Sequence, residues 1–226
     1  MNRTRMLAAL AAAALVLPLA AQVATEANSQ YRTAEGRKAV AANLDSPDRD
    51  QRQKPAEVVR AMGLQPGMTV ADVGTGVGYM LPFLSRGVGA SGKVIGEDIF
   101  DDYLAAARRR VQQDKLVNVT FIKGSEKDPM LPAGTLDRVL VLDVYHHFDY
   151  PQSMLAGIYR ALKPDGKLVI VEYYKNKTAM PNGRALTHIR LNKPDVIKEV
   201  EANHFHVVAQ REQIPDEQYM LTLEKK

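Results

Sequence analysis

Residues 70–79 read Val70-Ala-Asp-Val-Gly-Thr-Gly-Val-Gly-Tyr79, an apolar run that ends in an acid and continues with glycine at every second position. The apolar part, Thr69–Val73, is typical of a buried strand, and the pattern from Tyr79 onward favours a helix. A strand that turns through glycines into a helix lets a ligand approach the backbone and directs the free N–H groups of the helix toward it. The stretch therefore predicts a ligand-binding loop after the first strand of a sheet.

Strand and helix patterns alternate on both sides of this loop. Strands are predicted at 69–73, 93–99, 119–123, 136–143 and 167–173, with helices at 54–63, 79–86, 101–115 and 151–162. A helix at 194–203 and a closing antiparallel pair, 206–212 and 219–224, complete the chain. This alternation predicts an α/β fold, a doubly wound and mostly parallel seven-stranded sheet with helices on both faces.

Composition indicates a globular protein with no special charge character. The chain has 226 residues, of which 46% are apolar and 25% charged, and its formal charge is +4. Basic residues are scattered, and the run Arg108-Arg-Arg110 is typical of a solvated helix face, so we expect no nucleic-acid partner. The absence of cysteine excludes thiol nucleophiles and disulfides. His204 and His206 have no carboxylate or cysteine beside them, and we expect no metal site.

The N-terminus has the layout of a secretory signal peptide. Arg3 and Arg5 precede an apolar, alanine-rich run, and small residues follow up to Ala21. We predict a signal peptide at 1–21, a polar linker that leads into the domain at 22–53, and one catalytic-type domain at 54–226. The product would be exported to the periplasm or secreted. If the segment stays uncleaved, residues 7–24 are close to the length of a membrane anchor.

The spacing of the glycines leaves two ligands open. A dinucleotide fingerprint has the spacing Gly-x-Gly-x-x-Gly, whereas Gly74-x-Gly76-x-Gly78 is one residue shorter and Asp72 precedes it. Glu97 and Asp98 lie near the end of the second strand, beside the loop in an open sheet. A carboxylate there can accept hydrogen bonds from both hydroxyls of a ribose; the alternative, which we favour less, is that Asp98 caps a helix or is a solvated acid.

These motifs resemble class I S-adenosylmethionine-dependent methyltransferases. The resemblance lies in Asp72-Val-Gly-Thr-Gly-Val-Gly78, Gly96-Glu-Asp98, Leu131-Pro132 and Leu162-Lys-Pro-Asp-Gly166, in order. Gln53-Lys-Pro and Asp143-Val-Tyr-His-His-Phe148 are similar to a subgroup of methyltransferases without an assigned acceptor, some of which carry signal peptides. About three quarters of the chain is covered, which implies the Rossmann-like methyltransferase fold.

The resemblance also implies how the cofactor S-adenosylmethionine is held. Asp72 and the glycine loop would surround its methionine part, Asp98 its ribose, and the turn Gly124-Ser125-Glu126 its adenine. Many family members carry an aspartate at the position of Ser125, so this adenine contact departs from the pattern. The full set of expected cofactor-binding residues is Asp72, Gly74, Thr75, Gly76, Gly78, Glu97, Asp98, Ser125, Glu126 and Asp143.

Candidate catalytic residues follow the fourth strand, where open sheets place their sites. They are Asp143, Tyr145, His146 and His147. A tyrosine or histidine there can orient a substrate or accept a proton near neutral pH, but either histidine could also only pack beneath the loop. Glu172, after the fifth strand, could face the same cleft or merely end its strand. His188-Ile-Arg190 resembles an element of the subgroup that would close over the cleft.

The sequence thus predicts a methyltransferase that uses S-adenosylmethionine and a small-molecule acceptor. Two alternatives stay open: an exported, non-catalytic protein that binds S-adenosylmethionine or a nucleoside on the same fold, and an NAD(P)-dependent oxidoreductase. The glycine spacing and Asp72 disfavour the oxidoreductase. The sequence indicates neither an oligomeric state nor the atom that would be methylated.

Overall fold

The computed structural model describes residues 23–226 of the chain. The predicted signal peptide at 1–21 lies outside the described residues. Within residues 23–226, no helix combines the length and the apolar character that a membrane crossing requires.

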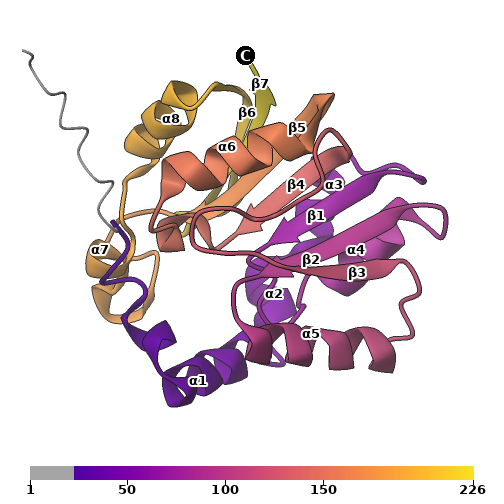
Figure 1. The fold of residues 1–226 in the computed structure, drawn as a ribbon. Coiled ribbons are helices and arrows are strands. Elements are labelled where there is room, and N and C mark those ends of the chain that lie inside the picture. Colours follow the sequence, from indigo (N-terminus) through magenta and orange to yellow (C-terminus); the bar gives the residue numbers. More distant parts are fainter. Residues whose placement is uncertain (1–22) are drawn as a thin grey trace, which may run out of the picture.

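A seven-stranded sheet forms the centre of the molecule, as predicted (Figure 1). Its order is β3-β2-β1-β4-β5-β7-β6, in which the first five strands are parallel and β7 pairs antiparallel with both β5 and β6. The strands are β1 (Thr69–Val73), β2 (Lys93–Asp98), β3 (Val119–Lys123), β4 (Leu136–Leu142), β5 (Leu162–Tyr173), β6 (Phe205–Ile214) and β7 (Gln218–Lys225).

Helices cover both faces of the sheet because its central strands are apolar on both sides. Along β4, Val139 and Val141 belong to one core cluster, and Leu140 and Leu142 to the other. The first cluster packs against α6 (Pro151–Ala161) and α8 (Lys193–Ala202), and the second against α3 (Pro55–Met62), α4 (Leu81–Val88) and α5 (Asp101–Gln113). This two-layered core confirms the doubly wound prediction.

Several predicted boundaries differ from the structure, and two of the differences have a clear cause. Helix α4 starts at Leu81 rather than Tyr79, because the loop continues with bonds from Gly78 N–H to Thr75 O and from Leu81 N–H to Gly78 O. Strand β5 starts at Leu162, five residues before the predicted 167, since Leu162 already pairs with β4 ahead of an irregularity in the ladder.

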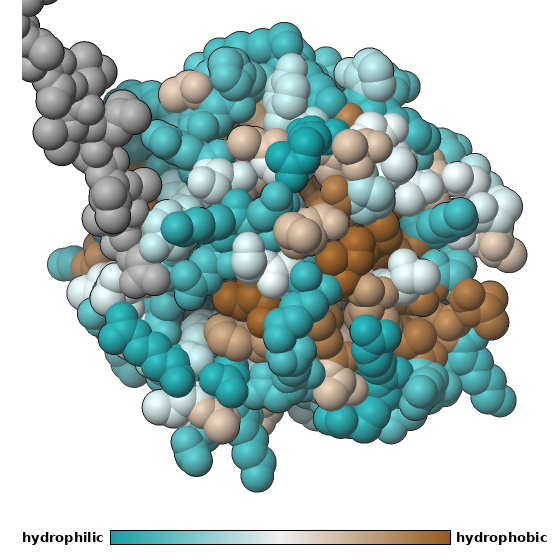
Figure 2. Space-filling model, viewed as in Figure 1, coloured by the Kyte–Doolittle hydropathy of each residue, from teal (hydrophilic) through white to brown (hydrophobic). Residues whose placement is uncertain are grey.

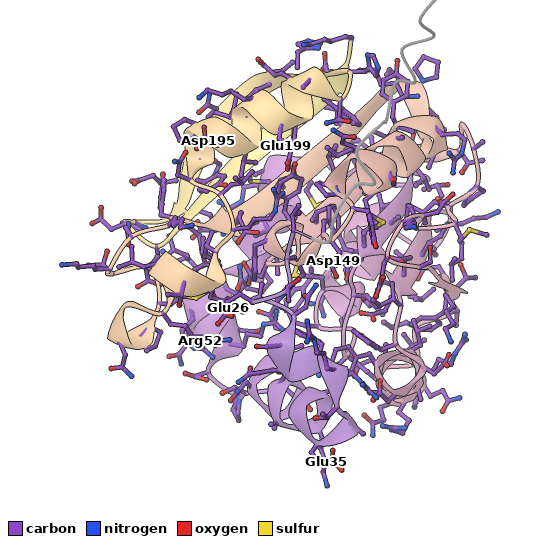
Figure 3. All side chains as sticks on the ribbon, turned by 60° about the vertical axis from the view of Figure 1, so that its left-hand side comes forward. Glu26, Glu35, Arg52, Asp149, Asp195 and Glu199 are labelled. Carbon is purple, nitrogen blue, oxygen red and sulfur yellow. The ribbon has the colours of Figure 1, made fainter. Side chains whose placement is uncertain are left out.

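Residues 23–53, the described part of the predicted linker and entry segment, are folded. They contain η1 (Ser29–Arg32), α1 (Ala34–Leu44) and α2 (Arg49–Gln53). The side chain of Thr33 accepts a hydrogen bond from Gly36 N–H and so caps α1. No residue of α1 is buried, and Glu35 on this helix points away from the rest of the molecule (Figure 3). The segment is therefore a thin cover over the end of the sheet.

The long connection 174–192 also contains short helices, η3 (Pro181–Gly183) and α7 (Ala185–His188). Ala179, Ala185 and Ile189 form a small buried cluster of their own there. On the face seen in Figure 2, hydrophobic side chains gather between α6 and α5, and hydrophilic ones cover most of the rest. Between β3 and β4 the chain runs as a loop, which leaves this part of the sheet less covered.

Candidate cofactor and substrate site

A cavity of about 320 Å³ lies at the carboxyl ends of β1, β2 and β4. This is the edge at which open parallel sheets bind ligands, and the volume is within the usual range of small-molecule sites. Of the predicted cofactor-binding residues, the cavity is lined by Gly74, Thr75, Gly76, Glu97, Asp98, Ser125, Glu126 and Asp143. Asp72 and Gly78 do not line it.

The N–H groups of the glycine loop are occupied by the end of β2. Gly74 N–H donates to Glu97 Oε2 at 3.2 Å, Thr75 N–H to Glu97 O at 2.8 Å, and Gly76 N–H to Asp98 Oδ2 at 2.9 Å. The N–H groups of these three loop residues are therefore not free to donate to a ligand. A pyrophosphate, which needs such free donors, would meet carboxylates instead.

Two of the glycines have distinct roles. Gly74 has φ +71°, and a Cβ there would lie 2.5 Å from Val144 Cγ1. Gly78 has φ +81°, and its Cβ would lie 3.0 Å from the Cβ of Ala107 on α5. Gly78 thus allows α5 to approach the loop, while Gly74 forms part of the cavity wall.

Buried carboxyl groups surround the loop. Burial raises the pKa of Asp72 to about 7 and that of Asp98 to about 6. Burial together with the charge of Glu172 raises the pKa of Asp143 to about 7. Such an environment favours a positively charged ligand, because a cation would offset the cost of ionising these groups.

Glu97 carries the clearest sign of a missing partner. Its side chain lines the cavity and is 1% exposed, and among the described residues its Oε1 has no hydrogen-bond partner. Burial also raises its pKa well above the usual value. An unsatisfied buried acceptor is costly, so the position fits a ligand that donates a hydrogen bond, such as a ribose hydroxyl or an amine.

Asp143 links three parts of the chain at the floor of the site. It follows β4 with φ +57°, a left-handed conformation uncommon outside glycine. Its Oδ1 accepts from Gln218 Nε2 at 2.8 Å, and Gln218 Oε1 accepts from Gln53 Nε2 at 3.0 Å. The carboxylate is therefore oriented by β7 and by α2 of the 22–53 segment.

The four predicted catalytic residues separate into two pairs. Asp143 and His147 line the cavity, whereas Tyr145 and His146 do not. Tyr145 is buried, and its hydroxyl donates to Glu199 Oε1 at 2.7 Å. His146 lies 2.7 Å through Nδ1 from Glu172 Oε2, both side chains being buried. Tyr145 and His146 thus lie in the protein interior behind the cavity, and the Glu172 carboxylate faces His146 rather than the cavity.

His147 is held in one tautomer by the 22–53 segment. Asn28 Nδ2 donates to His147 O and to Asp149 Oδ2, so Asn28 Oδ1 is the acceptor for His147 Nδ1–H at 2.8 Å. The other ring nitrogen, Nε2, lies 3.5 Å from the hydroxyl of Tyr31. Burial and the neighbouring histidines lower the pKa of His147 well below its usual value, so the ring is neutral.

Sequence reasoning missed one whole wall of the cavity. The residues of this wall, which the sequence did not single out, come from the 22–53 segment and are Asn28, Tyr31, Arg32, Arg37, Leu44 and Arg49. The Tyr31 ring stacks on the Phe100 ring with 5.9 Å between the ring centroids. The two rings form an aromatic patch at the rim of the cavity, beside Asp98. Arg49 is 9% exposed and lies 3.9 Å from the centroid of the Tyr79 ring. A polar stretch without periodicity gives no signal of such a role.

Three comparisons place this geometry among known proteins. A family model described as a methyltransferase domain matches residues 71–170. A SAM-dependent methyltransferase from Aquifex aeolicus is 28% identical, with a TM-score of 0.75 over 82% of this chain and 96% of that one. The structure of the [4+2]-cyclase SpnF, at 19% identity and a TM-score of 0.59 over 70% and 58% of the two chains, shares the fold.

Among curated proteins, the ubiquinone/menaquinone biosynthesis C-methyltransferase UbiE of Marinomonas sp. is 30% identical over 119 residues. The match covers 52% of this chain and 47% of that protein, so the chain spans about half the length of the curated relatives it matches. The fold, the loop and these matches make the chain similar to class I S-adenosylmethionine-dependent methyltransferases, with a methyltransferase domain at residues 71–170. S-adenosylmethionine is accordingly its cofactor, which the carboxylates and the unpaired Glu97 oxygen of the cavity fit.

Proposed function

We propose that this protein transfers the methyl group of S-adenosylmethionine to a small-molecule acceptor. The observation that supports this most directly is the cavity of about 320 Å³, which has buried carboxylates on the sheet side and the polar and aromatic side chains of residues 22–53 on the other. When bound, the cofactor supplies an electrophilic methyl group on a sulfonium cation.

The residues of this chain would hold the cofactor by charge and by hydrogen bonds. Glu97 and Asp98 are the acceptors nearest the end of β2, and Phe100 supplies an aromatic face beside them. Arg49 is a buried cation of the cavity wall, and its charge acts on both Asp72 and Asp143. It is suited to the carboxylate of the methionine part.

The acceptor would be oriented by residues beyond the carboxyl end of β4. Asp143 and His147 present oxygen and nitrogen acceptors to the cavity, and Tyr31 offers a hydroxyl. Burial raises the pKa of Tyr31 to about 12, so its proton stays in place for hydrogen bonding at neutral pH. Because transfer is an in-line displacement, holding the acceptor atom, methyl carbon and sulfur collinear is the main contribution these groups can make.

A small acceptor is favoured over a large one by the cover of the site. Val23 N–H donates to Asp149 O, and Ala24 N–H donates to Asp149 Oδ1. Asn28 Nδ2 donates a second hydrogen bond to this carboxylate, at Oδ2. The segment is therefore fastened over the cavity and restricts the size of what enters.

Calorimetry and turnover together test the proposal. We expect S-adenosylmethionine to bind, NAD(P) not to bind, and S-adenosylhomocysteine to be released when a panel of phenols, quinones and amines is supplied. Asp98→Asn should weaken S-adenosylmethionine by about 1–3 kcal/mol, the cost of losing a charged acceptor at a buried site. An affinity no better than millimolar would refute the proposal. Tight binding without turnover of any acceptor would instead favour the non-catalytic alternative.

We also propose that the protein is exported. The proposal is supported by the arginines, apolar run and small residues of positions 1–21 and agrees with a chain that has no cysteine. Mass measurement of the protein isolated from its own host tests it: a mature N-terminus close to residue 22 is expected, and an intact Met1 would contradict cleavage.

A further inference from the structure

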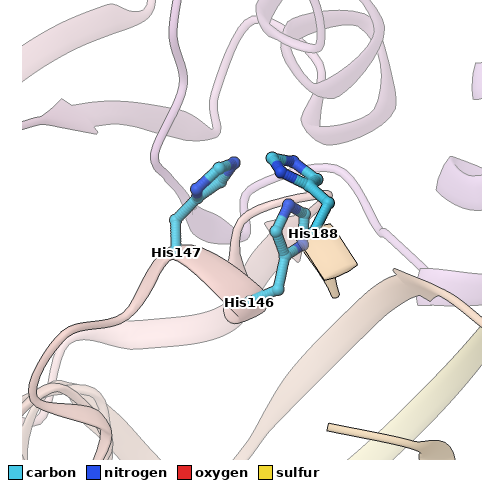
Figure 4. Close-up of side chains that lie close together, drawn as sticks. All are labelled: His146, His147 and His188. Carbon is cyan, nitrogen blue, oxygen red and sulfur yellow. The ribbon is translucent and has the colours of Figure 1, made fainter. Parts of the chain in front are cut away.

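Three histidines from distant parts of the chain meet beside the cavity. His146 and His147 lie in η2 (Tyr145–His147), and His188 is the last residue of α7. Figure 4 shows the three rings converging, and one ligand nitrogen of each lies within 4.8 Å of those of the other two. We propose that this cluster binds a divalent transition-metal ion of the zinc type, a site that the sequence did not indicate.

Hydrogen bonds outside the cluster already present two of the rings as ligands. Glu172 Oε2 accepts from the backbone N–H of His146 at 3.0 Å and lies 2.7 Å from its Nδ1. Asn28 Oδ1 accepts from His147 Nδ1 at 2.8 Å. In each neutral ring the proton is therefore on Nδ1, and Nε2 keeps its lone pair. A histidine whose second nitrogen donates to a carboxylate or carbonyl oxygen is the usual arrangement at metal centres.

Charges of both signs lie around the cluster. Glu172 stands directly behind His146, and the charges of both groups act on Asp143. A positive group opposes an ion: Arg184 Nη2 lies 3.4 Å from His188 Nδ1. Glu172 and Asp143 thus place negative charge near the cluster, while Arg184 beside His188 and Arg49, whose charge acts on Asp143, oppose it.

Only a modest movement is needed to close the site. Zinc–nitrogen bonds of about 2.0–2.1 Å in a tetrahedron place ligand nitrogens about 3.3 Å apart. The present spacing of up to 4.8 Å therefore has to shrink by roughly 1.5 Å. His146 is fixed by its buried pair with Glu172, whereas His188 is only partly buried at the end of a four-residue helix. We expect His188 to make the movement.

An ion at this position would stand at the cavity wall. His147 belongs to both the cluster and the cavity lining. The Tyr31 hydroxyl, now 3.5 Å from His147 Nε2, would give up this nitrogen to the ion. Three protein ligands leave a fourth position open, as in catalytic rather than structural zinc sites. The ion could therefore bind and polarise an oxygen of the acceptor.

Metal affinity, measured without any methyl acceptor, tests the site directly. Zn²⁺ is titrated into the tag-free protein in competition with a chromophoric chelator, and one ion per chain is expected. His188→Ala should weaken binding by about 100-fold or more, and Glu172→Gln, which loses only the orienting carboxylate, by about 10–100-fold. Arg184→Gln removes the opposing charge and should tighten binding. Circular dichroism and melting curves check that each variant is folded.

His206→Ala is the matched control, since His206 Nε2 lies 3.9 Å from Glu224 Oε2 on the edge strands, in a histidine–carboxylate pair that is open to solvent. Its affinity should equal that of the wild type. Co²⁺ gives a second readout: the visible absorption of tetrahedral cobalt should appear with the wild type and be lost with His188→Ala. Absence of stoichiometric binding, or equal binding by wild type and His188→Ala, would overturn the proposal and leave the methyltransferase assignment untouched.

Discussion

Asp72→Asn should stabilise the folded protein and at the same time weaken cofactor binding. Asp72 is 3% exposed, and its Oδ2 accepts from the hydroxyl of Thr75 at 2.7 Å. Burial raises its pKa from 3.8 to about 7. In the unfolded chain the group ionises at its ordinary pKa, so the folded state binds more protons between these values. Stability from this group is present below the unfolded pKa and is lost as the pH rises toward 7.

The size of the effect follows from the shift. A change of about 3 pKa units corresponds to about 4 kcal/mol of unfolding free energy once the carboxylate is ionised in both states, at pH 8. At pH 5.5 the folded carboxyl is mostly protonated, and the cost falls to about 2 kcal/mol. Asparagine is neutral at both pH values and keeps an oxygen for Thr75. Its gain should therefore reach at most about 4 kcal/mol at pH 8 and about half of that at pH 5.5.

Urea unfolding at the two pH values measures this gain, and calorimetry with S-adenosylmethionine measures the accompanying loss of affinity. Asp165→Asn is the matched control, because Asp165 is an exposed aspartate in the early part of β5, and its replacement should change neither quantity. A variant no more stable than the wild type at pH 8, or one equally stabilised at both pH values, would refute the reasoning that Asp72 is a costly charge retained for the ligand.

Three further predictions concern the same site. S-adenosylmethionine should bind about threefold to tenfold more tightly at pH 8 than at pH 5.5 by calorimetry, because a cation favours ionised carboxylates and burial raises the pKa of Asp98 to about 6 and of Asp143 to about 7. S-adenosylhomocysteine is uncharged at sulfur, so its affinity should depend less on pH. An equal pH dependence of the two affinities would contradict this. Gly78→Ala should lower the unfolding free energy by about 1–3 kcal/mol more than Gly63→Ala in denaturant titrations, since both have positive φ but only Gly78 has a neighbour within 4 Å; equal losses would exclude the steric explanation. Asn28→Ala should increase amide hydrogen exchange in the 22–53 segment, and unchanged exchange would show that other contacts hold it.

The fold was predictable because its signals are local. Apolar strands, helix breakers and glycine turns gave the seven strands, and Gly63 ends α3 with φ +62° as the sequence indicates. The start of β5 was missed because Leu162 enters the ladder through its partner Leu136, a pairing that no local pattern shows. Residues 22–53 were interpreted as a linker and entry segment for the same reason, since the start of the described segment is held by contacts with a distant residue, Asp149.

The site was predictable on the sheet side only. Glu97 and Asp98 end β2 and bind the glycine loop, so motif spacing was sufficient to find them. Position along the chain could not distinguish His147, which lines the cavity, from His146, which turns back to Glu172. One residue of difference in a 3-10 turn reverses the direction of the side chain, and only the packed structure settles which of the two is exposed to the ligand.

The glycine loop alone does not select the cofactor; the acids that bind its amides do. In a dinucleotide site the amides of such a loop are free and meet a pyrophosphate. Here Glu97 and Asp98 occupy the N–H groups of Gly74 and Gly76, so the same backbone turn is lined by negative charge. Replacing Glu97 by glutamine would keep one acceptor oxygen yet remove charge, and should weaken a cationic cofactor without admitting a phosphate. Cofactor choice thus depends on the two residues that end β2, which explains why one backbone motif serves ligands of opposite charge.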